Sequence, residues 1–224
     1  MTRNWNWPML VTVAMLAAGA PFGVSYAQSV NQEARFYQKH METHPSRGEV
    51  KTVEGTEAVL MTTDEGAFVS VSTRDLIPGN AYTMWFVAIN NPAACETSPC
   101  KGPDVVKRTA LTDSDVSYAD GLVARGDGTG RFAAYVPVGE MRRAWFGNGY
   151  KNAQGAEIHL VINHHGPLLP GMMDTMLGSY RGGCASEGLP EGFPETALTD
   201  GQPGPNACRF VQDVIFIQDG SSIN

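Results

Sequence analysis

The sequence predicts an all-β fold: a single antiparallel β-sandwich or barrel of about seven to nine strands, with an N-terminal helix in front. Two observations support this prediction. From Gly48 onward, short alternating or continuous apolar runs are separated by turns rich in Gly, Pro, Asn and Asp. Strands do not alternate with long helical patterns, which disfavours a parallel α/β fold.

The first 27 residues have the pattern of a signal peptide. Arg3 gives a positive start, residues 8–23 form an apolar run, and Ser25-Tyr26-Ala27 place small residues before the cleavage position. We therefore expect an exported protein, periplasmic or extracellular, whose mature chain begins at Gln28. The apolar run is too short for a membrane span, and no later segment is apolar enough to cross a bilayer.

Residues 28–47 are expected to form an N-terminal helix and its lead-in. Apolar residues recur there at helical spacing, at Val30, Ala34, Tyr37 and Met41, and Pro45 closes the segment. The β-sandwich domain is then expected over residues 48–218, with residues 219–224 as a tail.

Within this domain the apolar patterns predict strands at residues 57–62, 67–74, 81–90, 116–125, 131–138, 157–165 and 209–218. The almost unbroken apolar run 81–90 favours a central strand that is covered on both faces. Residues 116–125 and 131–138 flank Gly126-Asp127-Gly128-Thr129-Gly130 and are expected to form a hairpin. A helical turn near 104–107 and a short helix within 171–180 complete the prediction.

The charge of the chain argues against two classes of partner. Lys and Arg total 16 and Asp and Glu total 23, which gives a net charge of −7. An acidic chain without a basic run is poorly suited to nucleic acid or to an anionic lipid surface. A small molecule, a glycan or an envelope protein remains as the expected kind of partner.

Four cysteines lie in the mature part, at Cys95, Cys100, Cys184 and Cys208. An even number in an exported chain indicates two disulfides, and three pairings are compatible with the count. Proximity in the sequence favours Cys95–Cys100 and Cys184–Cys208. The alternative is a zinc site of four thiolates, which the spacing disfavours because it lacks paired C-x2-C motifs.

The strand 157–165 is the most interesting stretch, because it holds three of the five histidines. Alternation places Glu157, His159 and His165 on one face and His164 on the other. Glu157 and His159 lie about 6.6 Å apart along a strand, which suits two ligands of one metal or a carboxylate that orients an imidazole. His165 lies about 20 Å from His159 on an extended strand, so it needs other partners.

Copper or zinc is the metal that these candidate ligands suggest, with Met172, Met173 and Met176 close downstream as thioether donors. The alternative to a metal site is a purely structural role, in which the histidines are hydrogen-bonded and the methionines pack in the core. A second expectation is carbohydrate binding by exposed aromatic side chains at Trp145, Phe146 and Tyr150. No G-x-S-x-G, H-E-x-x-H or P-loop motif is present, so the chain carries no catalytic signature.

Several motifs occur in a characteristic order: Trp85 with Asn90-Asn91-Pro92 and Cys95, Glu157-Ile158-His159-Leu160, His165-Gly166-Pro167, Gly182-Gly183-Cys184, and Pro205-Asn206-Ala207-Cys208. In these the chain resembles a family of exported bacterial proteins to which no activity is assigned. The resemblance implies export, a Cys184–Cys208 link and a disulfide-bonded β-rich domain. It implies no catalytic residue.

The sequence therefore favours an exported binding or envelope-associated module that is not an enzyme. The alternative is a periplasmic copper- or zinc-binding protein, or a metalloenzyme, that uses histidines of the strand 157–165.

Overall fold

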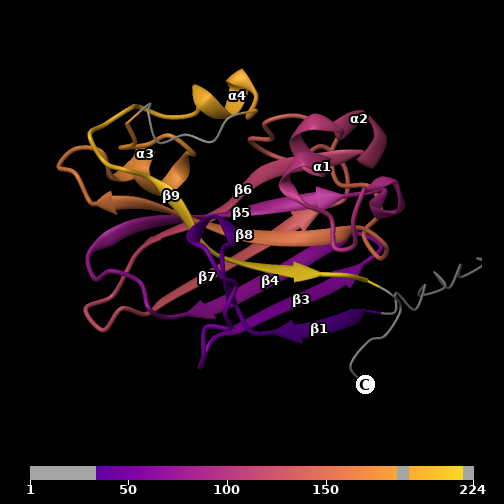
Figure 1. The fold of residues 1–224 in the computed structure, drawn as a ribbon, viewed down its shortest axis with the longest axis horizontal. Coiled ribbons are helices and arrows are strands. Elements are labelled where there is room, and N and C mark those ends of the chain that lie inside the picture. The colour runs from indigo at the N-terminus through magenta and orange to yellow at the C-terminus, as the bar shows by residue number, and fades with distance from the viewer. Residues whose placement is uncertain (1–33, 186–191, 219–224) are drawn as a thin grey trace, which may run out of the picture. The chain divides into compact units, whose positions relative to one another are not determined.

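The computed structural model describes residues 34–185 and 192–218, and in this part the chain forms two antiparallel sheets that pack face to face (Figure 1). The predicted β-sandwich is confirmed, and the sheets do not close into a barrel. In spatial order the four-stranded sheet holds β1 (Arg35–Lys39), β3 (Glu57–Thr63), β4 (Gly66–Thr73) and β7 (Gly130–Pro137). The five-stranded sheet holds β2 (Glu42–Thr43), β9 (Arg209–Phe216), β8 (Glu157–Pro167), β5 (Asn80–Ile89) and β6 (Ser114–Val123). The expected signal peptide and tail lie outside the described residues.

Short helices lie on the outer side of the five-stranded sheet (Figure 1). They are α1 (Gly102–Lys107), α2 (Thr109–Thr112), α3 (Met173–Gly178) and α4 (Glu195–Leu198), and two 3-10 turns, η1 (Pro45–Arg47) and η2 (Pro92–Ala94), accompany them. The helical turns predicted near 104–107 and within 171–180 are confirmed by α1 and α3. No helix in the described part is long and apolar enough to cross a membrane.

Strand alternation sorts side chains into two apolar clusters. Ile158, Leu160 and Ile162 of β8 point between the sheets and join the main core. Trp85 and Val87 of β5 point outward into a second cluster, which the helices and loops cover. Every residue of β5 is buried, as expected for a central strand covered on both faces. Because burying one large apolar side chain contributes about 1.5–3 kcal/mol, both layers stabilise the sheet.

The predicted N-terminal helix is wrong over the described residues, where β1 occupies residues 35–39 and β2 occupies residues 42–43 instead. Tyr37 and Met41 are buried as the pattern required, but the period is that of a strand. Residues of β1 flank Tyr37 on both sides and are exposed, and β1 pairs with β3 along its whole length. Long-range pairing therefore overrides the local helical spacing. Val30 lies outside the described residues.

The predicted hairpin is also wrong, although both of its strands are present. β6 pairs with β5 in one sheet and β7 pairs with β4 in the other. The intervening turn carries the chain between the sheets. The carboxylate of Asp120 on β6 accepts a hydrogen bond from the backbone N–H of Ala133 on β7, at 2.8 Å, which joins the two strands at this corner.

Both predicted disulfides are confirmed, between Cys95 and Cys100 and between Cys184 and Cys208. The first closes the loop before α1. The second ties the chain after α3 to the start of β9. With all four sulfurs in disulfides, the alternative zinc site of four thiolates is excluded.

Candidate functional site

The structure brings Glu157 and His159 together on the outer face of β8. His159 Nε2 lies 2.6 Å from Glu157 Oε1, and the same oxygen accepts a hydrogen bond from the backbone N–H of Cys100 at 2.7 Å. Both side chains are buried. The carboxylate thus orients the imidazole and also anchors the Cys95–Cys100 loop. Metal binding by this pair stays a prediction.

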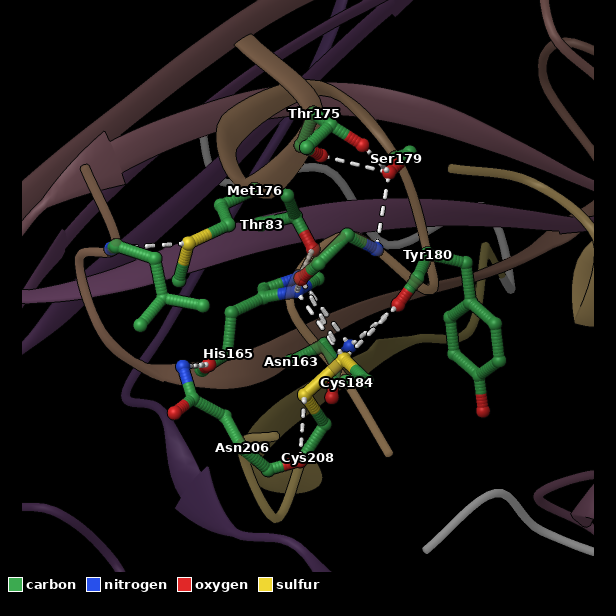
Figure 2. The surroundings of a disulfide bond; sticks show 12 residues. Thr83, Asn163, His165, Thr175, Met176, Ser179, Tyr180, Cys184, Asn206 and Cys208 are labelled. Carbon is green, nitrogen blue, oxygen red and sulfur yellow. Dashed lines mark hydrogen bonds between the residues drawn. A yellow bond between two sulfur atoms is a disulfide. The ribbon is translucent and has the colours of Figure 1, made fainter. Parts of the chain in front are cut away.

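His165 lies apart from that pair, in a buried network around the second disulfide (Figure 2). Its Nδ1 lies 2.8 Å from the carbonyl oxygen of Gly182, which can only accept, so the proton is on Nδ1. Nε2 then accepts from the Thr83 hydroxyl at 2.8 Å. No hydrogen bond or ion pair in the described part of the chain joins His165 to His159.

The network extends into the aromatic cluster on the outer face. Trp85 donates its indole N–H to the Thr83 oxygen at 2.9 Å, and that hydroxyl donates onward to His165. Burial lowers the pKa of His165 to about 4, so the imidazole is neutral near pH 7. Both ring nitrogens are satisfied, which makes His165 a structural residue that fixes β5 and β8 to the segment around Gly182.

The described residues contain one group of three metal-ligand side chains with donor atoms within 4.8 Å of one another: His165, Cys184 and Cys208. Its two sulfurs are joined as a disulfide and offer no thiolate. His165 Nδ1 already donates a hydrogen bond to the Gly182 carbonyl. This group therefore gives no support to a copper or zinc site in the oxidised protein.

Of the aromatic side chains expected to bind a glycan, those of Trp145 and Tyr150 are buried and that of Phe146 is half-buried. Trp145 is 5% exposed and its ring lies 4.2 Å from that of Trp85, centroid to centroid. Tyr150 is fully buried in the main core, where its hydroxyl donates to the carbonyl of Ala153. Both rings pack inside the fold, and glycan binding by them stays a prediction.

A cleft that the sequence did not indicate opens at the end of the sandwich where β4 ends and β5 begins. It encloses about 430 Å³. We call it the His164 cleft, and its walls come from three regions: the 43–53 segment, the loop after β4, and the first residues of β9 with the facing residues of β5 and β8. The lining residues are Thr43, Arg47, Glu49, Lys51, Val53, Asp75, Leu76, Ile77, Tyr82, His164, Arg209, Val211 and Gln212.

His164 occupies the last inward position of β8, where the core stripe of Ile158, Leu160 and Ile162 ends. The ring of Tyr82 packs against it with centroids 4.8 Å apart. The side-chain amide of Asn80 donates to His164 Nε2 at 2.7 Å. These two contacts fix the orientation of the imidazole.

The Asn80 contact also decides which nitrogen carries the proton. Because Nε2 accepts, a neutral His164 has its N–H at Nδ1. Burial, with Arg209 and Arg47 nearby, lowers the pKa of His164 to about 4, so the ring is neutral near pH 7. Nδ1 is buried and has no hydrogen-bond partner among the described residues. Leaving such a donor unpaired costs about 1–3 kcal/mol.

The charges around the cleft favour an anion. Lys51 is paired with Glu49 at 3.1 Å, and Asp75 is paired with Arg74 at 3.6 Å. Arg47 and Arg209 are exposed and have no ion-pair partner in residues 34–185 and 192–218. Two unpaired guanidinium groups and one unpaired N–H thus point to a ligand with acceptor oxygens and negative charge.

Sequence reasoning missed this cleft because its residues come from distant segments. Alternation did place His164 on the face opposite to His165, and the structure confirms this: His164 packs on Tyr82 of the main core, whereas His165 bonds to Thr83. Nothing in the sequence showed that the inward face would open to solvent at this position. Comparison of the chain with protein-family models, with curated proteins and with solved structures finds no match, so the family resemblance stays a prediction.

Proposed function

We propose that the chain is an exported binding protein that holds an oxyanion, a phosphate, sulfate or carboxylate group of a small molecule, in the His164 cleft. The observation that carries this proposal is the buried Nδ1–H of His164 beside the guanidinium groups of Arg47 and Arg209, all three without a partner among the described residues. The two disulfides are compatible with the oxidising compartment that export implies.

Each part of the cleft has a distinct role in this proposal. Arg47 and Arg209 supply charge and hydrogen bonds to the anion from the rim. His164 supplies one neutral N–H donor from the floor. Nδ1 is covered, so the exposed side chains of the rim must part to admit the acceptor. The proposed role of the cleft is binding without turnover.

The test is calorimetric titration of the full mature chain with inorganic phosphate, sulfate and a small dicarboxylate such as succinate. Arg209→Ala should weaken binding about tenfold or more, since a charge-assisted hydrogen bond contributes about 1.5–3 kcal/mol. Arg142→Ala, which removes an exposed arginine outside the cleft, is the matched control and should bind as the wild type does. Absence of binding for all three anions, or equal affinities for the two variants, would refute the proposal.

A further inference from the structure

A second cleft of about 350 Å³ lies next to the first. We call it the arginine cleft, because Arg74, Arg125 and Arg131 line it. Its other polar groups include the hydroxyls of Ser72 and Thr129. The end of β4, the turn between β6 and β7 and the start of β7 therefore meet around a strongly basic hollow.

The one carboxylate in its lining, that of Asp127, offsets only part of the charge of the three arginines, of which Arg74 also pairs with Asp75. Asp127 Oδ1 accepts hydrogen bonds from the backbone N–H and the hydroxyl of Thr129, at 3.0 and 2.7 Å. These bonds lower the pKa of Asp127 and commit that oxygen to the turn. Arg125 and Arg131 are exposed and have no ion-pair partner in the described part of the chain.

The two clefts share a wall. Thr73 and Arg74 line the arginine cleft, and the next residues, Asp75 and Leu76, line the His164 cleft. The backbone N–H of Leu76 donates to the carbonyl of Gly128 at 3.0 Å, which holds the β6–β7 turn against this wall. Gly128 has a φ of 75°, and a Cβ there would lie 2.8 Å from the Leu76 oxygen, so this close approach requires glycine.

The shared wall concentrates positive charge in an acidic protein. Six of the 16 Lys and Arg residues line the two clefts: Arg47, Lys51, Arg74, Arg125, Arg131 and Arg209. The carboxylates in the same linings are three, Glu49, Asp75 and Asp127. Since the chain as a whole carries −7, this end of the sandwich is where an anionic chain would be attracted.

Exposed aromatic rings continue the same surface along the four-stranded sheet. Arg131 and Tyr135 lie on one face of β7, about 13 Å apart along the strand. Tyr135 pairs with Phe68 on β4, and the two residues are 57% and 39% exposed. A ligand that reaches beyond the arginine cleft on this face therefore meets apolar ring surfaces.

We propose that the ligand is an acidic polysaccharide, whose anionic groups lie in the two clefts and whose sugar rings pack on Phe68 and Tyr135. This proposal rests on the oxyanion site proposed above for the first cleft. Carboxylate or sulfate groups match the guanidinium groups, and the apolar C–H faces of sugar rings match the exposed aromatics. Polyphosphate has no apolar face that could pack on Tyr135, and a nucleic acid is an alternative outcome of the test below.

The test compares three labelled polyanions of matched length: an oligogalacturonate, inorganic polyphosphate and an oligodeoxythymidine. The oligogalacturonate should bind tightest. Arg125→Ala combined with Arg131→Ala should weaken it about tenfold or more while phosphate titration of the His164 cleft stays unchanged. Tyr135→Ala should weaken it severalfold and leave polyphosphate binding unaffected. The Arg142→Ala control should bind as the wild type, and unchanged urea unfolding midpoints would confirm that all variants fold.

Two results would overturn the polysaccharide proposal: wild-type affinity of the double arginine variant for oligogalacturonate, or tighter binding of polyphosphate or oligodeoxythymidine. The failure of the first proposal looks different. In that case phosphate, sulfate and succinate do not bind, whereas oligogalacturonate still binds and still depends on Arg125 and Arg131.

Discussion

Two adjacent histidines, His164 and His165, have different surroundings because their side chains point to opposite faces of β8. His165 points outward, is fully hydrogen-bonded and fixes the loop that carries Cys184. His164 points inward, and its Nδ1 has no partner among the described residues. Alternation along a strand predicts that neighbours face opposite ways. It does not predict which face a loop will cover, so the sequence favoured His165 and the structure favours His164.

A second buried polar group, Asp213, predicts how stability depends on pH. Asp213 lies on β9 opposite Glu42, and its Oδ1 has no hydrogen-bond partner in the described region. Burial, with Glu42 nearby, raises its pKa from 3.8 to about 7. The folded state thus binds a proton more tightly than the unfolded state, and this carboxyl should destabilise the protein increasingly as pH rises from 4 to 7.

Asp213→Asn should remove that effect. Above pH 7 the variant should be more stable than the wild type by up to about 4 kcal/mol, and the difference should vanish near pH 4. Urea unfolding of both proteins at several pH values measures this difference in stability. Asp75→Asn, at an exposed ion pair, is the control and should change stability by less than about 1 kcal/mol at any pH. A difference for Asp213→Asn that does not vary with pH would contradict this account.

At the scale of elements, local patterns predicted strands well and their partners poorly. β3, β4, β5, β8 and β9 lie within a residue or two of the predicted ranges, because apolar alternation is a local signal. The spacing of Tyr37 and Met41 fits either a helix or two short strands. The strands form because β1 pairs with β3 and β2 pairs with β9. The turn after β6 is tight, yet its strands join different sheets, which turn chemistry alone does not specify.

The two disulfides should stabilise the fold to different extents. Loop closure over 5 residues contributes about 2 kcal/mol, and closure over 24 residues contributes about 3.5 kcal/mol. Cys95→Ala with Cys100→Ala is thus the matched control for Cys184→Ala with Cys208→Ala. Urea unfolding should show the larger loss for the second pair, which also packs beside His165. A larger loss for the first pair would show that the two loops do not behave as simple entropic closures.

At the scale of the whole molecule, the sequence predicts the fold class and the covalent links but not the His164 cleft. The cleft combines Arg47, His164 and Arg209, which only the order of strands in the five-stranded sheet brings together. The net charge of −7 likewise conceals the basic end of the sandwich, because a net charge does not show where the charged residues lie on the surface. Partner classes argued from net charge therefore need the surface that the structure provides.

The most direct test of the central proposal observes the imidazole nitrogens of His164 by 15N NMR near pH 7, with and without inorganic phosphate. The proposed site predicts a neutral ring with its proton on Nδ1 and a marked shift of that N–H on phosphate addition. His165, with the same tautomer but a bond to the Gly182 carbonyl, is the internal control and should not respond. A proton on Nε2 of His164, or spectra unchanged by phosphate, would contradict an oxyanion site in this cleft.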